Sequence, residues 1–250
     1  MGKAEIYQEQ LRDLDQDDWD AFLLAESGLP GPRGNIELAR ALAREGDAAR
    51  FDRYLAIDAG QAPVNDPRDF LAFCGVLGLG RLIAAGERPH SDLRPFANDP
   101  RWRLREATAM ALQAVGQADL QALDELRLWA GGSYLDQRAA AAGLCEPALL
   151  ASPQACALAF DVLDRVTNNI QQAPDRKDAA FRALRKGMAY CWSVAVASCP
   201  EQGKEHFEQW LESGDKDVRW IMRENLKKKR LVRMDEAWVG RCREKLPANA

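Results

Sequence analysis

The stretch Asp99-Pro100-Arg101-Trp102-Arg103-Leu104-Arg105-Glu106 recurs later in the chain as Asp217-Val218-Arg219-Trp220-Ile221-Met222-Arg223-Glu224. Five of the eight side chains are identical between the two copies. The offset of 118 residues corresponds to about three units of ~40 residues, the period of solenoids built from two-helix repeats. The repeat therefore predicts an architecture and indicates no chemistry of its own.

Helical periodicity recurs along nearly the whole chain, and the alternation typical of strands is absent. The expected helices cover residues 4–14, 17–26, 35–45, 47–58, 67–85, 100–115, 119–130, 134–146, 153–170, 176–198, 201–213, 217–227 and 233–245. Short turns rich in glycine and proline separate them, so consecutive helices should be antiparallel neighbours. With no long linker, we predict an all-α fold that forms one α-α superhelical array over residues 1–250.

Within each copy of the repeat, the aspartate and the last arginine have predicted structural roles. Asp99 and Asp217 are each expected to cap the helix that follows, because an aspartate accepts hydrogen bonds from the free N–H groups of a first turn. Arg105 and Arg223 are expected to flank the apolar stripe and to reach an aspartate in an adjacent unit.

The segment Asp99…Leu104-Arg105-Glu106-Ala107-Thr108-Ala109-Met110-Ala111-Leu112 resembles the second-helix consensus of HEAT repeats. That consensus has an aspartate, then a hydrophobic–arginine pair, then small residues ending in leucine. Met222-Arg223 matches the pair in the later copy, and Asp136-Gln137-Arg138 is a weaker third match. Residues 29–35 and 219–231 also resemble segments of bacterial HEAT-repeat-like proteins of the ARM/HEAT superfamily. The resemblance covers residues 30–235 loosely and implies a superhelical scaffold.

The same architecture is distantly similar to that of the DNA alkylation-repair glycosylases, which use a basic concave face with aromatic residues and an aspartate. Here Arg101-Trp102 and Arg219-Trp220 are each followed by a residue pair that leads into Arg-Glu, not by an aromatic pair and an aspartate. We therefore carry over no catalytic residue from that family. A nucleic-acid-binding protein stays the alternative to a scaffold.

Charge is spread unevenly along the sequence. The formal net charge is −4, yet residues 216–245 carry eleven bases against five acids and residues 1–27 carry eight acids against two bases. The run Lys227-Lys228-Lys229-Arg230 could neutralise phosphates, or it could complement the dipole at the end of the helix that begins near Asp217. Such asymmetry permits an anionic partner and equally fits a solvated helical surface.

The sequence shows no targeting or membrane-spanning segment. A charged helix is predicted directly after the first residues, and Arg81 interrupts the longest apolar stretch, so a cytoplasmic location is expected. The six cysteines, at positions 74, 145, 156, 191, 199 and 242, form no C-x-x-C pair and are expected to be reduced core thiols. His90 and His206 lie far apart in the sequence, which argues against zinc.

No motif in the sequence indicates catalysis or a cofactor. The glycines of Gly75-Val76-Leu77-Gly78-Leu79-Gly80 lack the strand and the third glycine of a dinucleotide fingerprint, so they are expected to let helices approach closely. Ser133 and Ser193 lack a nucleophile elbow. Catalytic, cofactor-binding and metal-binding residues are accordingly not expected, and an enzyme is the less favoured class.

The candidate partner-binding residues are cations and tryptophans: Arg101, Trp102, Arg105, Arg219, Trp220, Arg223, Lys227, Lys228, Lys229 and Arg230. They could line a concave face that stacks on bases or binds phosphates. Alternatively, the tryptophans fill gaps between repeats and the arginines bond carbonyls and carboxylates of neighbouring units, which we favour. Trp192 lies in a helix that is apolar on all sides and should belong to the core. The predicted function is a non-catalytic scaffold that binds a macromolecule, most simply a protein.

Overall fold

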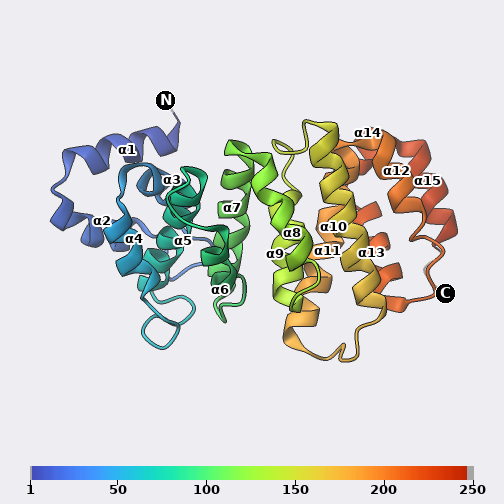
Figure 1. Cartoon of the computed structure of the whole chain (residues 1–250), viewed down its shortest axis with the longest axis horizontal. Helices are drawn as coiled ribbons and strands as arrows, with labels where there is room; N and C mark the ends of the chain where they lie inside the picture. Colours follow the sequence, from blue (N-terminus) through green and yellow to red (C-terminus); the bar gives the residue numbers. More distant parts are fainter. Residues whose placement is uncertain (1, 247–250) are drawn as a thin grey trace. The chain divides into compact units, whose positions relative to one another are not determined.

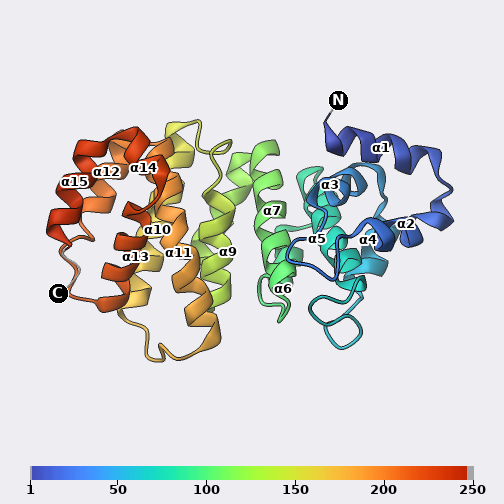
Figure 2. The same ribbon diagram turned by 180° about the vertical axis from the view of Figure 1, so that it is seen from behind.

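The computed structural model describes residues 2–246, which contain fifteen α-helices, three short 3-10 helices and no strand. The chain divides into two compact units, unit 1 at Met1–Asp119 and unit 2 at Leu120–Ala250. Figure 1 and Figure 2 show the elements of each unit from opposite sides. The predicted all-α class is confirmed for the described residues, whereas the superhelical arrangement and the single array over residues 1–250 stay predictions.

In unit 1, the odd-numbered helices pack side by side: α1 on α3, α3 on α5 and α5 on α7. The remaining helices cover this layer, since α2 and α4 pack on α5 and α6 packs on α7. The elements of unit 1 are α1 (Lys3–Asp13), η1 (Gln16–Asp18), α2 (Trp19–Glu26), α3 (Ile36–Glu45), α4 (Ala48–Leu55), α5 (Arg68–Ala84), η2 (His90–Leu93), α6 (Arg94–Ala97) and α7 (Trp102–Ala118).

Helix α5 is the core of unit 1 and is buried along most of its length. Two of its glycines allow this packing. A Cβ atom at Gly78 would lie 2.2 Å from the ring of Phe51 in α4, and one at Gly80 would lie 2.6 Å from Cβ of Ala111 in α7. The predicted role of the glycines in residues 75–80, close helix approach, is confirmed.

In unit 2, α11 packs against α9 and against α13. Helices α10 and α12 contact α11 as well as each other, and α14 contacts α11, α13 and α15. The elements of unit 2 are η3 (Leu120–Glu125), α8 (Leu126–Trp129), α9 (Tyr134–Leu144), α10 (Pro153–Gln171), α11 (Ala179–Ser198), α12 (Pro200–Glu208), α13 (Lys216–Leu226), α14 (Lys229–Met234) and α15 (Glu236–Lys245).

A run of aromatic rings forms the core of unit 2. The ring of Trp192 lies 6.2 Å from Phe160 and 5.9 Å from Phe207, and Phe207 lies 5.5 Å from Trp238. Trp192 is fully buried, and its Nε1 donates a hydrogen bond to Oγ1 of Thr167 at 3.1 Å. The prediction that Trp192 is a core residue is confirmed.

A half-buried carboxylate on α10 links this helix to α12 and to the turn that follows α12. Asp164 accepts hydrogen bonds from Nε1 of Trp210 at 2.6 Å and Nε2 of Gln209 at 2.8 Å, and Nδ1 of His206 lies 2.5 Å from its second oxygen. The His206 ring also stacks on Phe160 at 4.8 Å. These contacts give His206 and Asp164 a role in packing.

The expectation that all six cysteines are reduced is wrong for two of them. Cys156 and Cys199 form a disulfide with Cα atoms 6.1 Å apart. The cause is tertiary: the pair is 43 residues apart in sequence, and the fold brings the first turn of α10 next to the start of α12. Cys74, Cys145, Cys191 and Cys242 are buried free thiols, as expected.

Several predicted helix boundaries are also wrong. The span 119–130 is a 3-10 helix followed by one α-helical turn, and the helix predicted at 201–213 ends at Glu208. The helix predicted at 233–245 is preceded by α14 and begins after Asp235, whose side chain accepts a hydrogen bond from the N–H of Trp238 and so starts a new helix. The short helix α6 was not predicted. None of the helices in residues 2–246 combines the length and apolar character that crossing a membrane requires.

Candidate partner-binding surface

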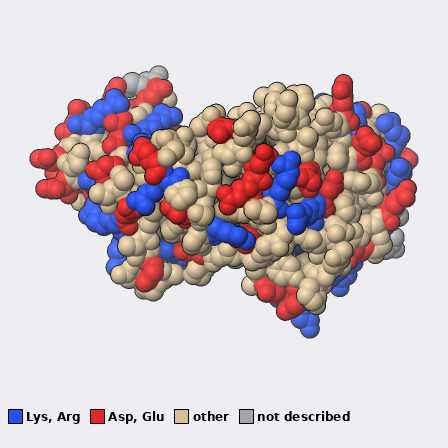
Figure 3. Space-filling view, in the orientation of Figure 1, with Lys and Arg blue, Asp and Glu red and all other residues tan. Residues whose placement is uncertain are grey.

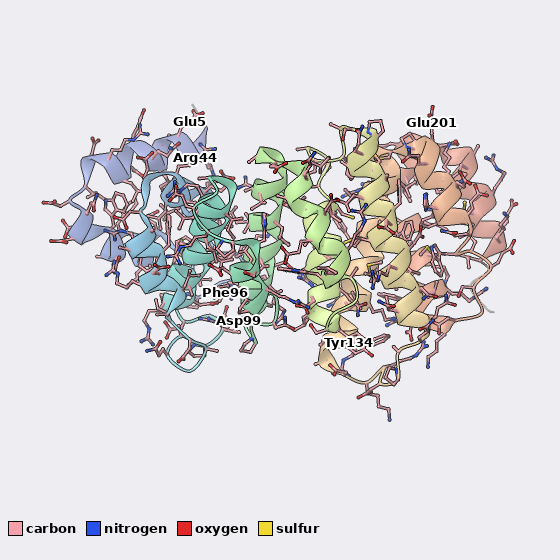
Figure 4. All side chains as sticks on the ribbon, in the orientation of Figure 1. Glu5, Arg44, Phe96, Asp99, Tyr134 and Glu201 are labelled. Atoms are coloured by element: carbon pink, nitrogen blue, oxygen red, sulfur yellow. A yellow bond between two sulfur atoms is a disulfide. The ribbon has the colours of Figure 1, made fainter. Side chains whose placement is uncertain are left out.

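Arg101 is buried at the start of α7, where it is the N-cap residue. Its guanidinium binds the Asp99 carboxylate through Nε at 3.0 Å and Nη2 at 2.8 Å. Its Nη1 donates to the carbonyl oxygen of Ala62 at 3.4 Å. Figure 4 labels Asp99, which lies in the turn between α6 and α7. Arg101 therefore holds the loop after α4 against α7 and presents no surface for a partner.

The predicted cap on this helix is wrong. Helix α7 begins at Trp102, not at Pro100, and has no side-chain cap. The Asp99 carboxylate instead accepts from the backbone N–H of Arg101 at 2.7 Å and from its guanidinium. Because the Asp99 carboxylate binds Arg101 in the turn before α7, it does not accept hydrogen bonds from the first turn of that helix.

Arg103 was not among the predicted site residues, yet it joins more segments than Arg101. Its Nη2 donates to the carbonyl oxygen of Gly31 at 2.6 Å and to Oδ1 of Asn65 at 2.9 Å. Its Nη1 lies 3.5 Å from Oδ2 of Asp69, a carboxylate with no exposed surface. An aspartate inside the first turn of the apolar helix α5 was the available sequence signal, because a buried acid needs a cation.

The Asp69 carboxylate is held between Arg103 and Arg101, whose Nε lies 3.9 Å from Oδ1 of Asp69. Burial raises the pKa of Asp69 above its ordinary value, although the two guanidinium groups act in the opposite direction. This buried network therefore serves the stability of unit 1.

Trp102 is the most exposed of the predicted site residues of unit 1, with 40% of the residue exposed, and Arg105 is half-buried. The guanidinium carbon of Arg103 lies 4.5 Å from its ring centroid. Nη1 of Arg105 donates to the carbonyl oxygens of Asp99 at 2.6 Å and Pro100 at 2.9 Å. The favoured interpretation, in which both tryptophans fill gaps, does not describe Trp102, which is exposed. Arg101 bonds a carbonyl of a neighbouring segment as that interpretation expects, whereas these two hydrogen bonds of Arg105 stay within the turn before α7, and its contact with an aspartate of an adjacent unit stays a prediction.

In unit 2 the cap prediction is wrong in a different way. Asp215, not Asp217, is the N-cap residue of α13, and its Oδ1 accepts from the N–H groups of Asp217 at 2.9 Å and Val218 at 3.0 Å. Burial alone would raise the pKa of Asp215. Hydrogen bonds from Arg176 and from these N–H groups outweigh this effect, so the pKa of Asp215 is lowered overall.

Asp217 is buried inside the first turn of α13 and pairs with two arginines. Nη1 of Arg176 lies 2.7 Å from Oδ2, and Nε of Arg185 lies 2.8 Å from Oδ1. The guanidinium carbon of Arg185, on α11, also lies 3.8 Å from the ring centroid of Trp220. Trp220 is half-buried beneath this arginine, so it packs against a neighbouring helix as the favoured interpretation expected.

The basic run Lys227-Lys228-Lys229-Arg230 does not form one helix end. Helix α13 ends at Leu226 with Lys227 as its C-cap, and α14 begins at Lys229. Lys227 is exposed and pairs with Glu224, and Lys229 is exposed. Only part of the run therefore lies where it complements the dipole of α13.

Tyr190 of α11 contacts the rest of this run. It is 48% exposed, the guanidinium carbon of Arg230 lies 4.4 Å from its ring centroid, and Arg230 also donates to its hydroxyl. Nζ of Lys228 lies 5.9 Å from the same ring. Trp192, two residues along the same helix, is buried, so the helix separates the surface ring from the core ring.

Sequence reasoning missed the outer side of α11. Arg182, Lys186 and Tyr190 are all exposed and follow a four-residue spacing, which places them on one side of the helix. The predicted helix 176–198 contains this spacing, but the apolar residues around Trp192 are the stronger pattern in that helix and indicate a core position. We name the surface formed by Arg182, Arg185, Lys186, Tyr190, Trp220, Lys228 and Arg230 the basic–aromatic face.

This face differs from the side of unit 2 formed by α8 and α10, where acidic and basic side chains are interspersed (Figure 3). There Nε of Arg127 lies 2.6 Å from Asp161. Helices α11 and α14 each carry three Lys or Arg residues and no Asp or Glu. Arg219 and Arg223 lie on α13 and are half-buried. The structure thus brings Trp220, Lys228 and Arg230 together with α11, while Arg101, Trp102 and Arg105 belong to the other unit.

Within residues 2–246 there is no cluster of three or more side chains suited to bind a metal ion. No protein-family model matches the chain, and neither a curated protein nor a solved structure gives a significant match. The HEAT-repeat resemblance therefore stays a prediction from the sequence.

Proposed function

We propose that the chain is a non-catalytic helical-repeat scaffold that binds a macromolecular partner through the basic–aromatic face of unit 2. The repeat architecture is supported by the packing of alternate helices within each unit, α1 to α7 in one and α9 to α13 in the other. This packing is what a stack of two-helix units requires, because each unit buries its apolar side against the next. The sequence resemblance to HEAT repeats points the same way.

The observation that carries the binding proposal is the one-sided charge of α11 and α14. Helices α11 and α14 together carry six Lys and Arg residues and no Asp or Glu, and of the six Arg185 pairs with Asp217 of α13. Tyr190 lies among them and exposes nearly half of its surface. Aromatic and arginine side chains are enriched at protein interfaces, and a surface of one charge sign attracts a partner of the opposite sign.

The partner that fits this face best is an acidic segment of a protein. Carboxylates would pair with the guanidinium and ammonium groups, and the tyrosine would supply apolar contact area. Nucleic acid fits less well, because Arg230 lies over the Tyr190 ring and Arg185 over the Trp220 ring, where bases would have to stack.

A fluorescence-anisotropy titration of the full chain tests the proposal. The probes are a labelled glutamate-rich peptide and single- and double-stranded DNA and RNA oligonucleotides of equal length, each at two salt concentrations. We expect the peptide to bind at low salt and to weaken as salt rises, since the contacts are partly exposed ion pairs. Tighter binding of an oligonucleotide than of the peptide would instead favour the nucleic-acid alternative.

A pair of charge-reversal variants locates the surface. Lys186→Glu combined with Arg230→Glu should weaken peptide binding by roughly tenfold or more, because two attractive contacts become repulsive. Arg165→Glu reverses an exposed charge on α10, in the other layer, and should change binding by less than about twofold. Equal losses of peptide affinity in the double variant and in Arg165→Glu, with unchanged melting temperatures, would contradict the proposed surface.

A further inference from the structure

A surface pocket of about 340 Å³ opens onto the Cys156–Cys199 disulfide. Its walls come from two places in unit 2: the turn that leads into α10, including Leu150 and Ser152, and the junction of α11 and α12, including Glu201. The two cysteines keep 7% and 8% of their surface exposed, and both line this pocket. A small molecule can therefore approach the sulfur atoms without opening the core.

Both cysteines lie where a helix starts. Cys199 is the N-cap residue of α12 as well as the C-cap residue of α11, and Cys156 lies in the first turn of α10. Helix α12 has no side-chain cap, and Pro200 at its first position supplies no N–H group. The free N–H groups of the next residues in α12 are suited to an anion at the N-cap position. A thiolate at Cys199 would accept these hydrogen bonds, whereas a disulfide sulfur accepts them poorly.

We propose that the Cys156–Cys199 disulfide is a thiol-exchange site that low-molecular-weight thiols reach through this pocket. The attacking thiolate forms a bond to Sγ of Cys156 while the Cys156–Cys199 bond breaks, and the electron pair leaves on Sγ of Cys199. The start of α12 stabilises that leaving thiolate. A mixed disulfide on Cys156 results.

A second thiol completes the reduction. Its thiolate attacks the small-molecule sulfur of the mixed disulfide and releases Cys156 as a thiolate, and both cysteines take up protons from water. Two small thiols are thereby oxidised to one disulfide while the protein disulfide is reduced to two thiols. A disulfide whose reduced form is stabilised in this way is easier to reduce than a purely structural one.

The reduced chain keeps α12 in place through other contacts. Phe207 is buried against Trp192 and Trp238, Nζ of Lys204 lies 2.6 Å from Asp235, and Nε1 of Trp238 donates to Glu208 at 2.7 Å. Reduction should therefore lower the melting temperature without unfolding unit 2. The site can then cycle between two folded states.

The test measures how fast reduced glutathione reduces the disulfide in the full native chain. Free thiols are trapped with a maleimide and located by peptide mass spectrometry. We expect a rate that is proportional to thiol concentration and changes by less than about twofold in urea below the unfolding transition, with trapped glutathione on Cys156. A rate that rises with urea along the slope of global unfolding would overturn the proposal, because the disulfide would then react only in the unfolded chain.

A matched pair of variants tests the pocket as the route. Glu201 lies at the start of α12 (Figure 4) and is one of the residues that line the pocket, and Glu205 lies one turn further along the same helix. Glu201→Gln removes a negative charge from the path of anionic glutathione and should raise the rate roughly three- to fivefold at low salt. Glu205→Gln removes a charge further from the disulfide and should raise the rate by a clearly smaller factor, and neutral 2-mercaptoethanol should not distinguish the two. Equal rates for the two variants with glutathione would overturn the pocket route.

Discussion

In unit 1 the segment around Arg101 buries Arg101 and Arg103 and exposes Trp102, whereas in unit 2 the matching segment buries Asp217 and covers Trp220 with an arginine from α11. The two copies share five side chains but differ in where the helix begins. Trp102 is the first residue of α7, and Trp220 is the fifth residue of α13. A sequence match therefore does not ensure that the same side chains meet the core.

The residue two positions before each copy explains the shift. Asp215 precedes Asp217 and caps α13, while Ala97 occupies the corresponding place before Asp99. Alanine cannot accept a hydrogen bond from the first turn, so the chain before α7 stays in a turn and Asp99 binds Arg101 instead. The capping residue before the repeat therefore decides where the helix begins and which side chains of the repeat are buried.

The largest expected effect comes from the buried arginine of unit 1. Arg103→Ala should lower the free energy of unfolding by about 3–5 kcal/mol, because it removes a hydrogen-bonded cation from the buried Asp69 carboxylate. Urea denaturation of the full chain measures the loss. Arg40→Ala is the control, since its Nη1 lies 3.8 Å from Glu37 in an exposed ion pair that contributes about 0–1 kcal/mol. A loss as small as that of the control would show that Arg103 is not structural.

The two tryptophans should differ in the same assay. Full packing between repeats would predict a loss of about 2–5 kcal/mol for each alanine variant. Trp102 is 40% exposed, so Trp102→Ala should stay well below that range. Trp220→Ala should cost about 1 kcal/mol more, because Trp220 is half-buried and Arg185 lies 3.8 Å from its ring, against 4.5 Å for Arg103 and Trp102. Equal losses would mean that the two tryptophans pack alike, and a larger loss for Trp102→Ala would contradict the difference in their burial.

Asp69 in unit 1 and Asp215 in unit 2 should contribute pH dependences of opposite sign to stability. The pKa of Asp69 is raised, so the folded state keeps a proton that the unfolded state loses near pH 4, and stability falls as pH rises from there to the native pKa. The pKa of Asp215 is lowered, so its contribution is complete above the unfolded value of about 3.9 and is lost as pH falls through the native pKa.

Asparagine variants separate these two contributions. Asp69→Asn should remove the fall with rising pH, and Asp215→Asn should remove the loss at acid pH, each read as a slope of unfolding free energy between about pH 3 and pH 7. The slopes are compared, not the absolute stabilities, because both variants also lose hydrogen bonds. Slopes that change in the same direction would contradict the assigned environments.

Periodicity and composition predict the fold class well, since long apolar stripes such as that of α5 can only be buried as helices. Single-turn elements such as α6, and the break at Asp235, escape prediction because caps and 3-10 turns carry little periodic signal. The Cys156–Cys199 pair and the Arg103–Asp69 pair depend on contacts between distant segments. Trp220, Lys228 and Arg230 were predicted as binding residues, but their neighbour Tyr190 on α11 emerges only when the helices are packed.

Hydrogen exchange with mass spectrometry, with and without a glutamate-rich peptide at low salt, tests most directly where the chain binds its partner. Binding at the basic–aromatic face predicts slower exchange in residues 227–233, at the start of α14, and no change in residues 94–105 around the start of α7. Protection confined to residues 94–105 would contradict the account, because the exposed Trp102 and not the face of α11 and α14 would then be the contact.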